Sequence, residues 1–283
     1  MNDYIQLTKP RITWLILMST GVGFYFGAGS GWSWLVLLHT IIGTGLIASG
    51  TAALNQWWER EADARMARTK KRPLPGHRIS PVKALWFAIA LSVAGFVELW
   101  FGANVLTAVL GAFTLATYLF VYTPLKQRTP HSTTVGAIPG AMPPVIGYAA
   151  ANGALTIEAW TLFAILFLWQ FPHFYSIAWM YRDDYSRAGI KMLPVVDETG
   201  ERTARQILIY ALVLLPVSLA PTFLHMSGML YLAGAALLSL MYLYYGFRIT
   251  SDRTRGAARQ VLLASIAYLP LLYGLMILDR PAL

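Results

Sequence analysis

The sequence predicts an all-α, polytopic membrane protein whose helices cross the bilayer nine times. Two observations of composition support this fold class: 57% of the residues are hydrophobic and 12% are charged, which is more apolar than a soluble domain requires. The third observation is a series of apolar stretches long enough to cross about 30 Å of hydrocarbon. As one domain spanning residues 1–283, the chain is expected to have membrane helices near residues 12–28, 34–58, 82–101, 104–123, 133–151, 157–181, 205–224, 228–247 and 257–278.

The lysines and arginines follow the topology of these helices. Of the 22 basic residues, 21 lie before the first apolar stretch or in every second connection, and Arg280 is the exception. Because cytoplasmic loops collect positive charge, the N-terminus is expected in the cytoplasm and the C-terminus outside. The net charge of +9 therefore reflects topology, and nucleic-acid binding, which would need a basic face on a soluble domain, is not expected.

Two further features bear on chemistry and location. The chain contains no cysteine, which excludes disulfides, a thiolate nucleophile and cysteine metal sites. No Arg- and Ser-rich amphipathic run precedes the first apolar stretch, and the last stretch ends close to Leu283. Neither a transit peptide nor a tail domain is therefore expected, which favours a bacterial inner-membrane protein over an organellar precursor.

Small residues and prolines distinguish some of the expected helices. Glycine, alanine, serine and threonine are frequent in 42–53 and 136–147, and small residues in lipid let helix backbones approach one another closely. Pro139, Pro143 and Pro144 predict a kink in the fifth helix, because proline lacks the backbone N–H and clashes with the preceding turn.

A polar stretch follows the second helix, at its cytoplasmic end. Asn55, Glu59 and Asp63 are spaced at i, i+4 and i+8, so they share one stripe of a single helix. Their oxygen atoms suit a hard cation such as Mg²⁺. Arg68 and Arg72 extend the polar stretch with two guanidinium groups suited to phosphate oxygens.

A second acidic cluster, Asp183 and Asp184, follows the sixth helix at the same face. If the two clusters face one another across a cavity, they form an acidic mouth ringed by arginine and lysine. Such a mouth fits a Mg²⁺–diphosphate, in which the metal neutralises part of the phosphate charge and the basic side chains bind the remainder. The competing interpretation is a solvated network of salt bridges next to the membrane.

The spacing of these residues resembles the first motif of the intramembrane UbiA-type prenyltransferases, and in particular of their haem O synthase branch, the protohaem IX farnesyltransferases. Further stretches are similar to motifs of that branch across roughly residues 7 to 200: Leu7-Thr-Lys9-Pro10-Arg11, Tyr122-x3-Lys126, Gly140-Ala-Met-Pro143-Pro144-Val-Ile-Gly147-Tyr148, Leu168-Trp169-Gln170-Phe-Pro172-His173-Phe174, and Asp184-Tyr185 with Gly189-Ile-Lys191-Met-Leu-Pro194. Together the motifs are specific, whereas each alone would be weak.

The resemblance implies a helical bundle around a central cavity that opens near the cytoplasmic face. In it, a farnesyl group would pass from farnesyl diphosphate to a vinyl group of haem B in a Mg²⁺-dependent reaction. Carried onto this sequence, the metal ligands would be Asn55, Glu59, Asp63, Asp183 and Asp184. The diphosphate would contact Arg68, Arg72, Tyr122, Lys126 and Lys191, while the catalytic set would be Asn55, Glu59, Asp63, Lys126 and Asp184. Partners implied are the lipid bilayer and a haem A synthase or terminal-oxidase assembly factors.

The chain departs from the wider family at two places. Glu59 occupies a position where the family favours aspartate, and Arg187 and Ala188 stand where a second aspartate of the later acidic motif is expected. The longer Glu59 side chain can still reach a metal. The missing aspartate leaves the number of Mg²⁺ ions open, and Lys191 is a candidate to bind phosphate directly in its place.

His173 and Arg11 are the residues that the resemblance assigns to haem. His173 follows Pro172 inside an expected membrane helix, where ionisable side chains are costly and usually functional. One hypothesis is that its imidazole coordinates or orients the haem iron. The alternative, equally weighted, is a hydrogen-bonded core histidine beside the proline.

Two other functions compete with farnesyl transfer to haem. A UbiA-type prenyltransferase that modifies an aromatic quinone precursor would use the same fold and the same diphosphate. A membrane transporter is the alternative from a different class, but transporters place ionisable groups near the bilayer midplane. Here the acids gather at helix ends, which disfavours transport.

Overall fold

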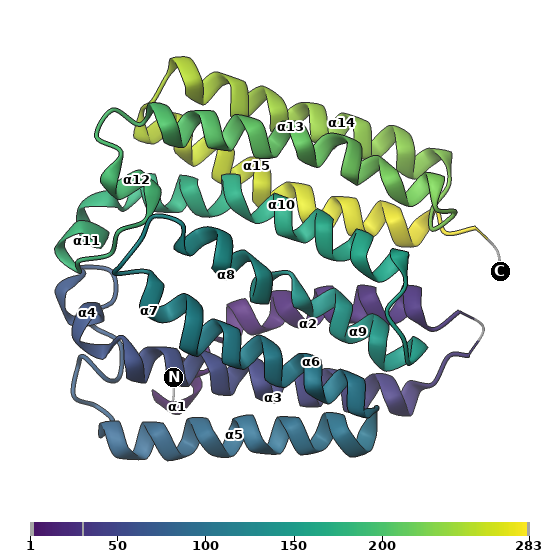
Figure 1. Ribbon diagram of the computed structural model, residues 1–283, viewed down its shortest axis with the longest axis horizontal. Helices are drawn as coiled ribbons and strands as arrows, with labels where there is room; N and C mark the ends of the chain where they lie inside the picture. Colours follow the sequence, from purple (N-terminus) through teal and green to yellow (C-terminus); the bar gives the residue numbers. More distant parts are fainter. Residues whose placement is uncertain (1–2, 30, 282–283) are drawn as a thin grey trace.

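The computed structural model describes residues 3–29 and 31–281, and over those ranges the chain is helical with no strand. This confirms the predicted all-α class. Figure 1 shows long helices that run side by side across the molecule. In chain order the elements are α1 (Asp3–Leu7), α2 (Pro10–Gly27), α3 (Trp34–Trp58), α4 (Arg60–Arg65), α5 (Pro81–Gly102), α6 (Val105–Ala116), a π-helical segment (Thr117–Tyr122), α7 (Thr123–Leu125), α8 (Ser132–Gly140), α9 (Met142–Asn152), α10 (Ile157–Met180), α11 (Arg182–Arg187), α12 (Leu193–Val196), α13 (Glu201–Phe223), α14 (Met229–Ser251) and α15 (Arg255–Leu278).

Within the described ranges, seven helical segments are long and apolar enough to cross a membrane. They are α3, α5, the run from α6 to α7, α10, α13, α14 and α15, and each coincides with a predicted span. The chain is therefore a multi-pass membrane protein. The other two predicted spans correspond to α2 and to the pair α8 and α9, which are not among these seven.

The fifth predicted span is broken in two, where only a kink was expected. Helix α8 contains Pro139, Ala141 separates the two helices, and Pro143 and Pro144 lie in the first turn of α9. Three prolines within six positions remove three backbone donors, so one continuous helix cannot form there.

Helices α2 and α9 pack closely because each presents glycine to the other. A Cβ atom added to Gly23 of α2 would lie 1.9 Å from the carbonyl oxygen of Pro144. One added to Gly147 of α9 would lie 1.9 Å from the carbonyl oxygen of Thr20. Both distances are far below van der Waals contact, so this approach requires glycine on both helices.

The short elements collect at one end of the bundle. At the left of Figure 1 lie the short helices α1, α4, α7, α11 and α12. At the opposite end, short connections join the long helices. A buried apolar cluster built largely from α10, α13, α14 and α15 includes Leu162, Ile207, Tyr242 and Tyr268. The long helices thus form an apolar support that brings the polar segments together at one end.

We expect Gly23→Ala to destabilise the protein by about 1–3 kcal/mol or more, because the new methyl group overlaps the α9 backbone. Gly21→Ala in the same helix is the matched control, since a Cβ there meets no atom within 4 Å. Thermal unfolding of both variants in detergent measures the difference. Equal midpoints for the two variants would contradict the close packing of α2 on α9.

Candidate active site

The predicted stripe of Asn55, Glu59 and Asp63 is present at the junction of α3 and α4. The single helix that was expected ends at Trp58, because Glu59 adopts a ψ of 11°. Backbone hydrogen bonds from the Glu59 N–H to the Asn55 carbonyl (2.9 Å) and from the Asp63 N–H to the Glu59 carbonyl (2.8 Å) preserve the i, i+4 spacing. Asn55 and Asp63 are each 2% exposed and the Glu59 side chain is 13% exposed, so most of this polar stripe is removed from solvent.

Two cations pair with the carboxylates of the stripe. The Lys126 ammonium lies 3.0 and 3.2 Å from the two oxygens of Glu59. The Arg72 guanidinium donates a 2.7 Å hydrogen bond to Asp63. Burying a carboxylate is costly without such a partner, so the pairing explains how these acids are tolerated between helices.

Asn55 links the stripe to two residues that the sequence analysis did not assign. Its Nδ2 donates to Glu59 at 2.9 Å and to the Thr123 hydroxyl at 3.3 Å. Its Oδ1 accepts a 3.2 Å hydrogen bond from the Lys9 ammonium. Three segments far apart in the chain therefore meet at this one side chain.

Lys9 of the N-terminal motif, which had no predicted role, reaches this cluster. Lys9 adopts a left-handed backbone conformation with φ of 48°, which is uncommon for a residue with a side chain and marks a locally strained turn. Pro10 begins α2 immediately afterwards, and Arg11 is exposed on that helix. In the sequence, Lys9 is marked only by its position just before a proline that begins a helix. That position does not indicate whether Lys9 or Arg11 points toward the stripe.

The charges of the cluster shift one another's pKa. Burial raises the pKa of Glu59, but the charges of Lys126 and Lys9 and the hydrogen bonds from Lys126 and Asn55 together outweigh burial and hold it below its ordinary value. Burial lowers the pKa of Lys126, but Glu59 and the two neighbouring tyrosines, Tyr122 and Tyr118, together raise this pKa by more, so that it lies well above its usual range. Burial, together with the charges of Arg72 and Lys126, lowers the pKa of Lys9 to about 7. The cluster therefore holds more positive charge than its two carboxylates stabilise, which favours an anionic ligand.

Tyr122, predicted to contact diphosphate, lies against Lys126. The Lys126 ammonium is 4.5 Å from the centre of the Tyr122 ring and 5.8 Å from that of Tyr118. Both tyrosines belong to the π-helical segment, a rare conformation that occurs frequently at functional sites. These rings orient the Lys126 ammonium through cation–π contacts.

The second acidic motif meets the first through the loop after α4. Asp184 is buried, pairs with Arg187, and accepts a 3.3 Å hydrogen bond from the Ala67 backbone N–H. Burial raises the pKa of Asp184, but these hydrogen bonds outweigh it and lower the pKa below its ordinary value. Asp183 is exposed. In residues 3–29 and 31–281, no three acidic or histidine side chains gather closely enough to hold a metal by themselves.

Arg68 and Lys191, both predicted to bind diphosphate, have exposed side chains near this loop. Arg68 donates a 3.1 Å hydrogen bond to the Tyr185 hydroxyl and lies over the rings of Tyr181 and Tyr185. The Lys191 backbone N–H donates to the Lys126 carbonyl at 2.7 Å. The segment after α11 is therefore attached directly to the residue that carries the buried ammonium.

His173 lies within α10, seven residues before its end, which places it about 10 Å from that end along the helix axis. Its Nδ1 is 2.7 Å from the Ser265 hydroxyl oxygen, and its ring stacks on that of Trp169 with centroids 4.8 Å apart. The hydrogen bond expected of a core histidine is present. It leaves the other ring nitrogen for the predicted haem contact.

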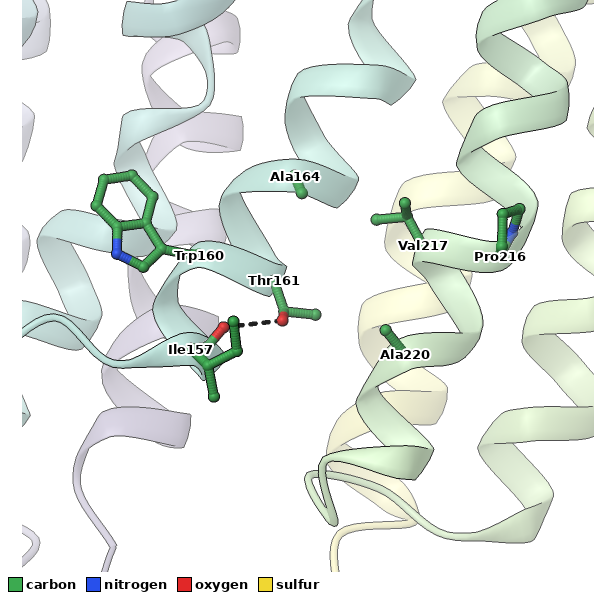
Figure 2. A pocket seen from close by; sticks show the side chains of 7 residues that line it. All are labelled: Ile157, Trp160, Thr161, Ala164, Pro216, Val217 and Ala220. Carbon is green, nitrogen blue, oxygen red and sulfur yellow. Dashed lines mark hydrogen bonds between the residues drawn. The ribbon is translucent and has the colours of Figure 1, made fainter.

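Two hollows differ in their relation to this cluster. A groove of about 340 Å³ lies between α10 and α13, and in Figure 2 Ala164 and Val217 face one another across it. Its lining includes Ile157, at the end of α10 away from the polar stripe, so it is not part of the candidate site. A smaller polar hollow of about 200 Å³ reaches Glu59 and is lined also by Trp58, Glu61, Ala62, Arg65, Thr123, Pro124 and Gln127.

Comparison with known proteins places this arrangement in a family. The model of the UbiA prenyltransferase family matches residues 16–269. The chain belongs to the UbiA prenyltransferase family. This UbiA chain is 66% identical to a protein named protoheme IX farnesyltransferase from Solibacter usitatus, with 100% of both chains covered. It is 48% identical to a protein of the same name from Koribacter versatilis, with 99% of this chain and 94% of the relative covered.

Solved structures support the UbiA fold. The chain is similar to a structure described as digeranylgeranylglyceryl phosphate synthase, with a TM-score of 0.83, 15% identity, and 98% and 97% of the two chains covered. It is also similar to a UbiA homolog from Archaeoglobus fulgidus bound to GPP and Mg²⁺, with a TM-score of 0.68, 18% identity, and 98% and 100% covered. The helical bundle is therefore that of the UbiA family.

We expect Lys126→Met to destabilise the protein by about 3 kcal/mol, because it leaves the Glu59 carboxylate buried and unpaired. Adding Glu59→Gln to this variant should restore much of the lost stability, since a neutral amide can stay buried with Asn55 as its hydrogen-bond partner. Lys70→Met, at an exposed lysine, is the control. Thermal unfolding without ligand compares the wild type, both single variants, the double variant and the control, and additive losses in the double variant would contradict the buried pair.

Proposed function

We propose that this chain is a Mg²⁺-dependent protohaem IX farnesyltransferase, which transfers the farnesyl group of farnesyl diphosphate to a vinyl group of haem B and so forms haem O. The observation that carries the proposal is the buried stripe of Asn55, Glu59 and Asp63 beside Lys126 and Arg72. The full-length similarity to proteins named protoheme IX farnesyltransferase supports haem as the acceptor.

The donor atoms of the stripe fit Mg²⁺. Carboxylate and carboxamide oxygens are its preferred protein ligands, and Mg²⁺ usually binds one or two carboxylates together with substrate phosphates. Asn55, Glu59 and Asp63 would hold the metal, which when bound neutralises phosphate charge and so makes diphosphate a better leaving group.

The second acidic motif has two members with different surroundings. Asp183 and Asp184 stay our predicted ligands on that side of the site. The contacts of Asp184 with Ala67 and Arg187 support a further role for it, in which it holds the loop after α4 against α11.

The cations of the cluster bind the diphosphate in this proposal. An ammonium group carries three N–H donors, of which the two oxygens of Glu59 engage at most two, so Lys126 keeps a donor for a phosphate oxygen. Arg72 likewise uses one nitrogen for Asp63. Lys9 adds a third cation beside the stripe, and the exposed Arg68 and Lys191 complete the basic rim. Electrostatic stabilisation of the departing diphosphate is the main catalytic contribution of these side chains.

The reaction needs no covalent nucleophile from the protein. The allylic C–O bond of farnesyl diphosphate breaks with both electrons leaving on diphosphate, and the allylic carbon bonds to the haem vinyl group. Water then supplies the hydroxyl of the hydroxyethylfarnesyl substituent and loses a proton. An apolar chamber limits premature capture of the farnesyl cation by water. His173 and Arg11 are the residues that we propose to contact haem.

We also propose nine membrane spans around a central cavity that opens near the cytoplasmic face. Seven are the long apolar segments, and the other two are α2 and the pair α8 and α9. The position of 21 of the 22 lysines and arginines supports a cytoplasmic N-terminus and an external C-terminus. We propose a bacterial inner membrane as the location. A haem A synthase or a terminal-oxidase assembly factor would receive the haem O product.

The direct test is to incubate the purified protein with haem B, farnesyl diphosphate and Mg²⁺ and to determine the mass of the haem. We expect haem O from the wild type and at least a hundredfold less from Asp63→Ala, in line with the loss of one electrostatic group at an active site. Glu198→Gln, at an exposed acid of the same end, is the control for insertion and activity.

The outcomes separate the candidate functions. Wild-type turnover in Asp63→Ala would contradict the proposed metal site. Unmodified haem together with a prenylated aromatic acceptor would favour the quinone-precursor enzyme. No covalent product from either acceptor would contradict a prenyltransferase and favour transport.

A further inference from the structure

Ser265 of α15 is completely buried and forms the closest polar contact of His173. The hydroxyl oxygen lies 2.7 Å from the Nδ1 atom of the imidazole. The two residues are 92 positions apart in the chain, and Ser265 lies outside the motifs that suggested a function. Its role therefore follows from the packing of α15 on α10.

The direction of this hydrogen bond is fixed by a second contact. The Ser265 hydroxyl also lies 2.6 Å from the carbonyl oxygen of Leu262. A carbonyl oxygen only accepts, and a serine hydroxyl has one hydrogen to donate. The hydroxyl thus donates to Leu262 and accepts from His173, so the imidazole carries its proton on Nδ1. Neutral His173 is then left with a free electron pair on Nε2.

The plane of the imidazole is held independently of this hydroxyl. Trp169 stacks on His173 with an angle of 22° between the rings. The indole N–H donates a 2.9 Å hydrogen bond to the Ser265 backbone carbonyl, and the Trp169 carbonyl accepts one of 3.3 Å from the Tyr242 hydroxyl. The stacking of Trp169 and its hydrogen bond to the Ser265 backbone do not involve the Ser265 hydroxyl. The hydroxyl also contacts the Tyr242 side chain, but among these contacts it is the one that sets the tautomer of His173.

We propose that Ser265 is a positioning residue, which holds His173 in the tautomer that presents Nε2 to the iron of the haem substrate. The inference rests on the proposed function, since it takes haem as the acceptor. Histidines that bind metals usually donate their other ring N–H to an oxygen, and this donation fixes the tautomer and makes the ligand nitrogen more basic. The contact of His173 with Ser265 has this form.

The test is a titration of the purified protein with ferric haem B, followed by absorption and electron paramagnetic resonance spectra. His173→Ala should lose the spectral features of an imidazole-bound iron. Ser265→Ala should bind haem about tenfold more weakly, the lower end of the usual cost of losing such a partner. Ser265→Thr, which keeps the hydroxyl, should restore binding to within about twofold of the wild type on the same grounds.

Two controls keep the result specific. Ser239→Ala removes another buried serine hydroxyl, which contacts Tyr268 at 3.0 Å and not His173, and it should bind haem as the wild type does. If Ser265→Ala does not fold, Ser265→Cys replaces it, because a thiol is a weak acceptor of similar shape. The change at Ser265 should add nothing to the loss in a His173→Ala background.

Wild-type affinity and spectra in Ser265→Ala, with a clear loss in His173→Ala, would overturn the positioning role. Unchanged spectra in His173→Ala would overturn it too, by removing the iron ligand. Neither result affects the mass test for haem O. Failure to form haem O from haem B, in contrast, refutes the proposed function itself.

Discussion

The buried pair of Glu59 and Lys126 is the interaction on which the candidate site depends. A carboxylate and an ammonium that leave water lose several kcal/mol of hydration each, and only close pairing with further hydrogen bonds offsets that loss. Asn55 donates such a hydrogen bond to Glu59, and the rings of Tyr118 and Tyr122 contact the Lys126 ammonium. Because Glu59 and Lys126 must pair, the end of α3, the π-helical segment and the loop after α7 lie next to one another. Lys9 then joins through Asn55, and Asp184 attaches α11 through Ala67.

This charge arrangement explains why the site suits a metal and a diphosphate together. Two acids face three cations, namely Lys126, Arg72 and Lys9, and the pKa of Lys9 is lowered to about 7. Positive charge therefore exceeds the negative charge that pairs with it. Diphosphate would supply the missing negative charge. When the lysine and arginine side chains bind phosphate instead of the carboxylates, Mg²⁺ would bind the carboxylates in their place. The apolar helices contribute differently. The close approach of α2 to α9 and the break at Ala141 place short, proline-rich helices inside the bundle.

Local features of the site were predictable from the sequence, and contacts between distant segments were not. The i, i+4 spacing of Asn55, Glu59 and Asp63 predicted the stripe, because helix geometry alone sets it. The prolines predicted a kink in the fifth span, whereas the structure has two separate helices there. The contact of Lys9 with Asn55 and the contact of Ser265 with His173 depend on tertiary packing. Neither leaves a periodic pattern in the chain.

The central claim is that the acids of the stripe couple Mg²⁺ to diphosphate. Calorimetric titration of the purified protein with farnesyl diphosphate, with and without Mg²⁺, measures that coupling directly. The account predicts binding at least tenfold tighter with Mg²⁺ in the wild type, an energy of about 1.4 kcal/mol, and little or no Mg²⁺ effect in a Glu59→Gln, Asp63→Asn double variant. Equal affinity with and without Mg²⁺ in the wild type, or an undiminished Mg²⁺ effect in the double variant, would contradict it.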